Sequence, residues 1–224
     1  MSIHIPISDY ILLEDPYILV INKPGGLMVE PDRNGYPNLL QQVKRYLQDS
    51  VSPGEEVYAQ HIHRLDRPVS GIILFAKQRT VLKNLSEQFA ERKVKKYYQA
   101  LTEKCPVQMK GKLEHWHRKE KKRAVLSEEA LPFSEKAILH YEVKPFDGNR
   151  FLWSIELHTG KYHQIRAQLA SVGCPVIGDA LYGSNIPYKA DSIALHAAKL
   201  IFYHPMSNEE IVVEKEVEFF YSPL

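Results

Sequence analysis

The sequence predicts an α+β fold, with a mixed, largely antiparallel sheet and flanking helices. Segments typical of strands outnumber segments typical of helices along the 224 residues. Two of the strand-like segments, 138–146 and 150–157, are joined by Asp147-Gly148-Asn149, a sequence typical of a hairpin turn. Hairpins make neighbouring strands antiparallel, which argues against a regular alternation of parallel strands and helices.

The first half of the chain is expected to contain two buried strands and two helices. Residues 17–22 (YILVIN) form a short apolar strand, ended by the turn Lys23-Pro24-Gly25-Gly26. Apolar residues within 39–47 have helical spacing. Residues 71–77 (GIILFAK) are typical of a second buried strand, and the apolar spacing that follows predicts a helix over roughly 79–91.

The second half is expected to contain more strands and one helix. Residues 94–102 and 195–203 are typical of strands, and 163–172 of a helix. In the predicted hairpin, alternation within 150–157 places Phe151, Trp153, Ile155 and Leu157 on one face. Residues 103–135 lack a clear period, so we expect an insertion or loop that lies over one face.

The length of 224 residues argues for one large domain or two small ones, and the composition for a globular protein. Hydrophobic residues make up 44% and charged residues 25% of the chain, and the two cysteines, Cys105 and Cys174, are isolated. This excludes a disulfide scaffold and favours a reducing compartment. Apolar runs fall far short of the roughly 20 residues that span a bilayer, and the N-terminus lacks signal-peptide features. We expect a cytoplasmic protein without membrane contact.

Basic charge is concentrated in one segment. Residues 92–123 contain 12 lysines and arginines and three glutamates, a net charge of +9. Because the whole chain carries only +2, the remaining residues carry −7. Such a segment is typical of a surface that binds a polyanion. A solvated, lysine-rich surface loop is the alternative.

The segment His61–Gly71 (HIHRLDRPVSG) is the first candidate site. Pro68 disfavours a helix at the preceding residue, which places Asp66 in a loop at the entrance of a buried strand. With Arg64 and Arg67 nearby, the Asp66 carboxyl group should stay ionised, as a nucleophile or general base must. The alternative is a structural ion pair that fixes the loop.

A metal site built from the histidines is another alternative. His61, His63 and Asp66 offer three candidate ligands, and further imidazoles come from His115, His117 and His163. The adjacent Arg64 and Arg67 would repel a dication, and the histidines share no spacing rule. We therefore expect no metal.

The segment Leu157–Arg166 (LHTGKYHQIR) is the second candidate site. A strand ends at Thr159-Gly160 and a helix begins near residues 161–163, so free amides and Lys161 are available to an anion. His163 and Arg166, three residues apart, share a helix face. Arg166 could pair with a catalytic carboxylate, clamp a phosphate or make an ordinary surface salt bridge.

Two further segments have features of interest. In residues 94–100 alternation places Lys96 and Tyr98 on one side of the strand, where they could contact phosphate and base; aromatic strand packing is the alternative. Gly178–Gly183 (GDALYG) is typical of a tight turn in which Asp179 caps local amides. Residues 118–123 add a basic run whose candidates for phosphate contact are Lys119, Lys121, Lys122 and Arg123.

Together these segments resemble the RluA family of pseudouridine synthases. The similarity to that family's motifs runs in family order over about residues 17–205, which makes it specific. The matching segments are NKPGG (22–26), HRLDRPVSG (63–71), VKKYYQAL (94–101), TGKYHQIR (159–166), GDALYG (178–183) and LHAAKLIFYHP (195–205).

The resemblance implies a single catalytic domain over residues 1–224, with the pseudouridine synthase fold and a basic cleft, and a role for individual residues. Asp66 would be the catalytic aspartate, Tyr98 would lie against the target base, and Arg166 would pair with Asp66. Arg64 would occupy the gap left by a flipped nucleotide. The family's frequent N-terminal S4 domain has no room before residue 22, and the pair Arg67-Pro68 resembles the TruC-type branch, which acts on tRNA.

The implied reaction isomerises a uridine of tRNA or rRNA to pseudouridine. The N-glycosidic bond breaks, the uracil rotates and C5 joins the ribose, so no cofactor is required. We expect RNA contacts from Arg64, Arg67, Lys96, Lys161, His163 and the basic run. We also expect a monomer without an obligatory protein partner. A non-catalytic RNA-binding module and a metal hydrolase built on His61 and His63 are the rival functions.

Overall fold

The computed structural model describes residues 4–32, 35–217 and 219. The chain divides into two compact units, each described here by itself. Unit 1 comprises Met1–Val94 and Ala198–Glu216, and unit 2 comprises Lys95–Ala197 and Val217–Leu224. No helix among the described residues is long and apolar enough to cross a membrane.

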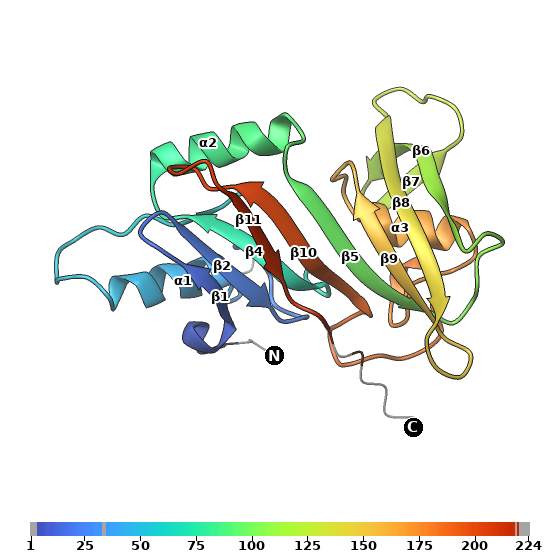
Figure 1. Ribbon diagram of the computed structural model, residues 1–224. Coiled ribbons are helices and arrows are strands. Elements are labelled where there is room, and N and C mark those ends of the chain that lie inside the picture. Colours follow the sequence, from blue (N-terminus) through green and yellow to red (C-terminus); the bar gives the residue numbers. More distant parts are fainter. Residues whose placement is uncertain (1–3, 33–34, 218, 220–224) are drawn as a thin grey trace. The chain divides into compact units, whose positions relative to one another are not determined.

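Unit 1 is built on a sheet with the strand order β1-β2-β4-β10, in which β3 pairs with β4 and β11 with β10 (Figure 1). The pairs β1–β2, β2–β4, β3–β4 and β10–β11 are antiparallel. Helices α1 and α2 and a short 3₁₀ helix complete the unit. The elements are η1 (Ile7–Tyr10), β1 (Ile11–Glu14), β2 (Ile18–Lys23), α1 (Leu39–Gln48), β3 (Gln60–His61), β4 (Ser70–Ala76), α2 (Arg79–Ala90), β11 (Glu210–Glu214) and, from Ala198 onward, β10 (Leu195–Tyr203).

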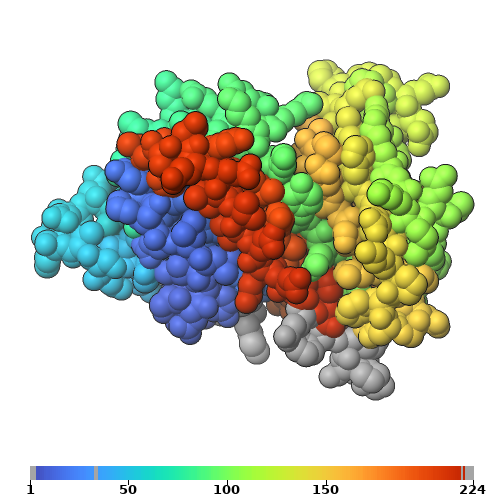
Figure 2. All heavy atoms as spheres, in the orientation of Figure 1, coloured from blue at the N-terminus to red at the C-terminus, as the bar shows by residue number. Residues whose placement is uncertain are grey.

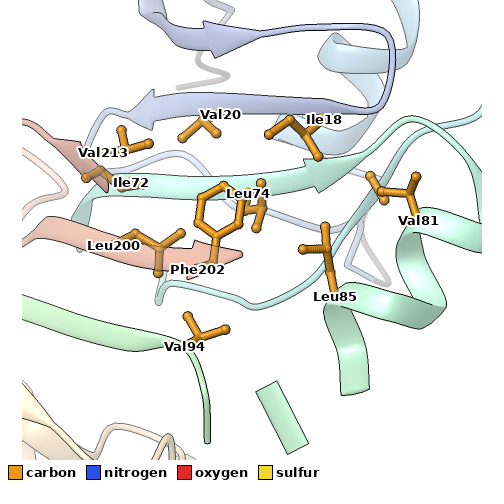
Figure 3. Packing of buried hydrophobic residues seen from close by; sticks show 11 residues of the cluster. Ile18, Val20, Ile72, Leu74, Val81, Leu85, Val94, Leu200, Phe202 and Val213 are labelled. Carbon is orange, nitrogen blue, oxygen red and sulfur yellow. The ribbon is translucent and has the colours of Figure 1, made fainter. Parts of the chain in front are cut away.

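The core of unit 1 brings together strands from both ends of the chain. Ile18 and Val20 of β2 pack with Leu74 of β4, Phe202 of β10 and Val213 of β11 (Figure 3). In the space-filling view the C-terminal strands of the unit, in red, accordingly lie beside the N-terminal strands, in blue (Figure 2). Removing this apolar surface from water is the main stabilising contribution to the unit.

Helix α2 packs one apolar face on this core. Val81 and Leu85, four residues apart on the same helix face, are 1% and 0% exposed. In contrast, all four residues Ile18–Ile21 of β2 are fully buried. Because neighbouring residues of a strand point to opposite faces, both faces of β2 are covered, which explains its continuous apolar sequence.

Unit 2 is an antiparallel sheet with the strand order β5-β9-β8-β6-β7. Trp153 of its strand β9 is fully buried, and its indole N–H donates to the Thr102 hydroxyl at 2.8 Å. Helix α3 packs against β6 and β7. The elements are β5 (Lys95–Thr102), β6 (Lys110–Glu120), β7 (Arg123–Ser127), β8 (Glu135–Pro145), β9 (Phe151–Leu157), α3 (Gln164–Ser171) and η2 (Ala180–Tyr182).

The predicted α+β class with a mixed, largely antiparallel sheet is confirmed. The expected strands at 17–22, 71–77, 94–102 and 195–203 correspond to β2, β4, β5 and β10, and the expected hairpin to β8 and β9. The three expected helices correspond to α1, α2 and α3. A single domain over residues 1–224 stays a prediction.

The expectation of a loop or insertion over residues 103–135 is wrong. This segment contains β6 and β7, and β6 pairs with β8 from Lys110 to His117. Its inward positions alternate through Leu113, His115 and His117. His117 is buried because its Nε2 lies 2.7 Å from the carbonyl oxygen of Tyr162. With histidines at two inward positions, the apolar alternation that marks a strand is hidden.

Candidate functional site

The loop that contains Asp66 joins β3 to β4 in unit 1, as predicted. The amide of Val69 donates to the carbonyl oxygen of Asp66 at 3.0 Å, which closes a tight turn. The side chains of Leu65 and Val69 are buried on either side of Asp66, which is itself partly buried. Because these two apolar side chains are buried, the backbone of the loop is held in place at Asp66.

Lys23, the last residue of β2, forms a hydrogen bond to this loop. Its side chain is fully buried, and Nζ donates to the carbonyl oxygens of Pro24, Leu27 and Arg67 at 2.9, 2.8 and 3.2 Å. Burial lowers the pKa of Lys23 to about 7, and the carboxylate of Asp66 opposes this shift. A buried amine therefore lies within electrostatic reach of the candidate catalytic carboxylate.

A second link joins the loop to the turn after β2. The amide of Gly26 donates to the carbonyl oxygen of Arg67 at 2.8 Å, and Nε of Arg67 donates to the carbonyl oxygen of Gly26 at 3.0 Å. Gly26 has a φ of +82°, a conformation that favours glycine. Arg67 therefore holds two loops together, a role that the sequence did not reveal.

Arg64 points to a different acid from the one expected. Its guanidinium group pairs with Glu30, and 58% of its side chain remains exposed. His61 lies beside the same acid, with Nε2 3.5 Å from the Glu30 carboxylate. Burial lowers the pKa of His61, with Glu30 opposing the shift. Exposure leaves Arg64 accessible to a ligand, which would have to exchange with Glu30.

The imidazoles considered as metal ligands have hydrogen-bond partners of other kinds. Nε2 of His63 accepts the amide of Leu74 at 3.3 Å. Nδ1 of His115 lies 3.0 Å from the side-chain amide of Gln168. His117 contacts a backbone carbonyl, as described above, and His163 contacts a tyrosine hydroxyl, as described below. These contacts give the histidines structural roles.

In unit 2, Tyr98 and Lys96 lie on the same side of β5, as predicted from alternation. Tyr98 is 7% exposed and stands opposite Ile155 of β9. Nζ of Lys96 lies 3.4 Å from the position that a Cβ on Gly160 would occupy. Strand β5 and the turn before α3 therefore meet, and a glycine at that turn leaves room for the lysine.

Arg166 of α3 makes a buried, bidentate ion pair with Asp179. Nε donates to Oδ2 at 2.6 Å and Nη2 to Oδ1 at 2.9 Å, and the two side chains are 6% and 1% exposed. Paired hydrogen bonds of this kind fix the plane of a guanidinium group. The expected amide cap by Asp179 is wrong, since its side chain makes no cap hydrogen bond and binds Arg166 instead.

Sequence reasoning missed Asp179 as a partner of Arg166. The two residues are 13 positions apart in the chain, and no local pattern joins them. The one available signal was the presence of both in segments that resemble the same family. Pairing of Arg166 with Asp66 involves residues of two units and stays a prediction.

An aromatic group surrounds this ion pair. Arg166 lies 5.1 Å from the ring centroid of Tyr182, whose hydroxyl accepts the amide of Ala124 at 2.7 Å. Nδ1 of His163 lies 3.0 Å from the same hydroxyl. The ring of His163 stacks on that of Tyr162 at 3.8 Å. His163 and Arg166 thus meet at one tyrosine, although His163 precedes α3 in a left-handed conformation (φ +52°) and does not belong to the expected helix face.

The tip of the β6–β7 hairpin adds positive charge beside these rings. Nζ of Lys119 lies 4.4 Å from the ring centroid of Tyr162, and the guanidinium carbon of Arg123 lies 5.4 Å from that of Tyr182. Lys121 has a φ of +50° in the turn itself. We call Lys119, Lys121, Lys122 and Arg123 the basic tip; all four are exposed.

The N-terminus of α3 is more occupied than expected. The amide of Lys161 donates to Oε1 of Gln164 at 3.0 Å, and its Nζ pairs with Glu135 at 2.8 Å. Hydrogen bonding by Lys161 lowers the pKa of Glu135. An anion that binds here would therefore have to replace Glu135 at the lysine.

Comparison with protein families places this site in context. A family model described as RNA pseudouridylate synthase matches residues 17–171. The match extends from β2 to the end of α3, and so includes Asp66, Tyr98 and Arg166.

Individual proteins agree with this match. The RNA pseudouridine synthase YhcT of Bacillus subtilis is 34% identical over 206 residues, covering 91% of this chain and 67% of that protein. The tRNA pseudouridine synthase C of Vibrio parahaemolyticus is 29% identical, covering 95% and 92%. The structure of human RNA pseudouridylate synthase domain containing 4 has a TM-score of 0.76 at 21% identity, covering 95% and 90%, which shows a shared fold.

Proposed function

Since this chain belongs to the RluA family of RNA pseudouridine synthases, we propose that it isomerises a specific uridine of tRNA or rRNA with Asp66 as the catalytic aspartate. Members of the family are isomerases. The observation that supports Asp66 is the construction of its loop. Three carbonyl contacts from the buried Lys23 and the two links between Gly26 and Arg67 hold a carboxyl group at the start of β4.

The chemistry requires a charged carboxylate that stays in place. In this proposal the Asp66 carboxylate carries that charge. It attacks the sugar or assists its deprotonation when the N-glycosidic bond breaks. The uracil then rotates, C5 joins the ribose, and the proton released from C5 leaves. Substrate and product contain the same atoms, so the reaction needs neither a redox partner nor a group donor.

Tyr98 and Arg166 are the other two residues of the proposed machinery. Tyr98 offers a flat ring for the uracil and a hydroxyl that relays the proton from C5. Arg166 orients Asp66. The pair with Asp179 supports this role, because it holds the guanidinium group in one plane before any substrate arrives.

RNA binding is proposed to involve two sets of residues. Arg64, Arg67, Lys96, Lys161 and His163 contact RNA near the reacting nucleotide, with Arg64 filling the gap in the base stack. The basic tip binds further phosphates of the RNA. Flipping a nucleotide out of its stack costs a few kcal/mol, and phosphate contacts offset this cost.

Two relatives carry names that indicate a substrate class. One is a tRNA pseudouridine synthase of Vibrio parahaemolyticus, and another is a ribosomal large subunit pseudouridine synthase of Buchnera aphidicola. We propose an RNA substrate of one of these two classes, acted on by a monomer in the cytoplasm. Light scattering of the purified chain at assay concentration tests the monomer; a stable dimer would contradict it.

Pseudouridine mapping tests the proposed function. Unmodified tRNA and rRNA are incubated with the wild-type protein and sequenced for pseudouridine. We expect one or a few new pseudouridines that reappear in every replicate at the same positions. A protein that binds RNA but creates no pseudouridine in either pool would instead be a binding module.

A further inference from the structure

Three side chains on one face of the unit 2 sheet form a group outside the proposed machinery. Among the residues that the structure describes, His140, Glu156 and His158 have ligand atoms that all lie within 4.8 Å of one another. His140 belongs to β8, Glu156 to β9, and His158 follows β9 directly. Figure 1 shows these two strands side by side.

The backbone ladder fixes the three positions. His140 and Glu156 are direct partners in the antiparallel pairing of β8 and β9. His158 lies two residues after Glu156, so it projects from the same face. Its amide donates to the carbonyl oxygen of Ile138 at 3.2 Å, which extends the pairing by one step. No loop movement is needed to bring these side chains together.

The distances match a single metal ion. Nε2 of His158 lies 3.2 Å from Nδ1 of His140 and 3.7 Å from Oε1 of Glu156. Zinc lies about 2.0–2.1 Å from imidazole nitrogens in a tetrahedral site, so its ligand atoms are separated by roughly 3.3 Å. Small side-chain rotations would therefore place all three ligands around one ion.

The charges around the group also suit a cation. Lys112 stands opposite His140 on β6, but its ammonium group pairs with Glu114. The group itself has one carboxylate and two imidazoles, and the lysine that stands opposite it on β6 is paired with an acid. The His61 segment differs, since two arginines lie within it.

We propose that His140, Glu156 and His158 form a binding site for Zn²⁺, in which two imidazoles and one carboxylate hold the ion and water completes its coordination. Bound zinc would join β8 to β9 and stabilise unit 2. Tyr98 pairs with Ile155, the neighbour of Glu156, and so points to the opposite face of the sheet. The site is therefore separate from the proposed isomerisation chemistry.

Calorimetric titration with zinc chloride tests the site. The full chain is purified without a histidine tag, stripped of metal, and titrated in a non-coordinating buffer. We expect one zinc per chain, with His140→Ala and His158→Ala each weakening the affinity at least about tenfold. Two control variants should bind like wild type: Glu142→Gln, which removes another acid of β8, and His4→Ala, which removes an exposed histidine.

Two further measurements identify the ligands. Zinc should raise the melting temperature of wild type and Glu142→Gln, but not that of His158→Ala, and the chelated proteins should melt alike. Cobalt(II) should give the visible absorption of a tetrahedral ion only where both histidines remain. Zinc affinity and cobalt spectra that are the same in wild type and His158→Ala would overturn the site, as would the absence of stoichiometric binding.

Discussion

Lys23 shows how one buried residue can support a reactive group elsewhere in the chain. Its ammonium group contacts three backbone carbonyls, one of them at Arg67, directly after Asp66. The amine is buried at the end of an apolar strand, where a lysine normally would not be placed. Its position indicates that hydrogen bonds from this buried side chain stabilise the loop that contains Asp66.

The stability contributed by Lys23 should depend on pH. Burial lowers its pKa to about 7, whereas the unfolded chain keeps the usual value near 10.5. Between these values the unfolded state binds more protons, so stability rises with pH by at most about 1.4 kcal/mol per unit. The free energy of unfolding in urea is measured for wild type and Lys23→Met at pH 7 and at pH 9. The advantage of wild type over the variant should be larger at pH 9. An equal difference at both pH values would contradict the lowered pKa of the buried amine.

Arg166 should tolerate no other cation. Lysine keeps the charge but cannot reproduce the two parallel bonds to Asp179. We expect Arg166→Lys to lose about a hundredfold in turnover and to keep most of its RNA affinity. Arg150→Lys, which changes a partly buried arginine paired with Asp147 outside the proposed machinery, is the matched control. Wild-type turnover in Arg166→Lys would show that the oriented guanidinium group is not needed.

At this scale the sequence predicted some residues and missed others. Asp66, Tyr98 and Arg166 were chosen because their own segments contain recognisable patterns. Lys23 and Asp179 were missed as contacts because their partners lie 44 and 13 positions away. Such contacts depend on how the strands and turns fold back, which a local pattern does not contain.

At the scale of elements, the turn before η2 holds Asp179 in place. Gly178 has a φ of +87°, and a Cβ added there would lie 2.6 Å from the Cβ of Tyr188. Gly183 has a similar φ of +95° but nothing within 4 Å of the same position. An added side chain would therefore meet an unfavourable backbone conformation at both glycines, but steric overlap only at Gly178.

The two alanine substitutions should differ in cost. Gly183→Ala should lose about 1 kcal/mol of unfolding free energy through strain alone. Gly178→Ala should lose at least about 1 kcal/mol more, because an alanine there also overlaps Tyr188. Chemical denaturation of both variants checks this. Equal losses would mean that the turn relaxes easily.

The basic tip should supply affinity without selecting the base. Changing its four residues to glutamine should weaken RNA binding and reduce the log–log salt slope by about 0.7 per lost phosphate contact. The matched control changes four exposed lysines elsewhere in unit 2, at positions 104, 110, 112 and 144. An unchanged salt slope in the tip variant would show that this hairpin does not face RNA.

Elements were predicted where their pattern was apolar and regular. Strand β4 is an uninterrupted apolar run, and α2 repeats apolar residues at helical spacing. Strand β6 was not predicted because two of its inward positions are histidines. Their imidazoles are accommodated there by hydrogen bonds to Tyr162 and Gln168. Burial by a polar partner is a property of the tertiary structure, and composition does not reveal it.

At the scale of the whole molecule, the proposed machinery comes from both units. Asp66 belongs to unit 1, and Tyr98 and Arg166 belong to unit 2. The family model spans the segments that contain all three residues, and that they serve one reaction stays a proposal. Turnover measured on the full chain with substitutions at these residues tests whether they act on one uridine.

The most direct test of this account is a single-turnover assay of Asp66→Asn. Asparagine nearly matches the shape of aspartate but lacks the charge needed to attack the sugar or take a proton. We expect a folded variant that binds its RNA like wild type and forms no detectable pseudouridine, while chelators leave wild-type turnover unchanged. A folded Asp66→Asn protein that still isomerises uridine would contradict the assignment of Asp66 as the catalytic residue.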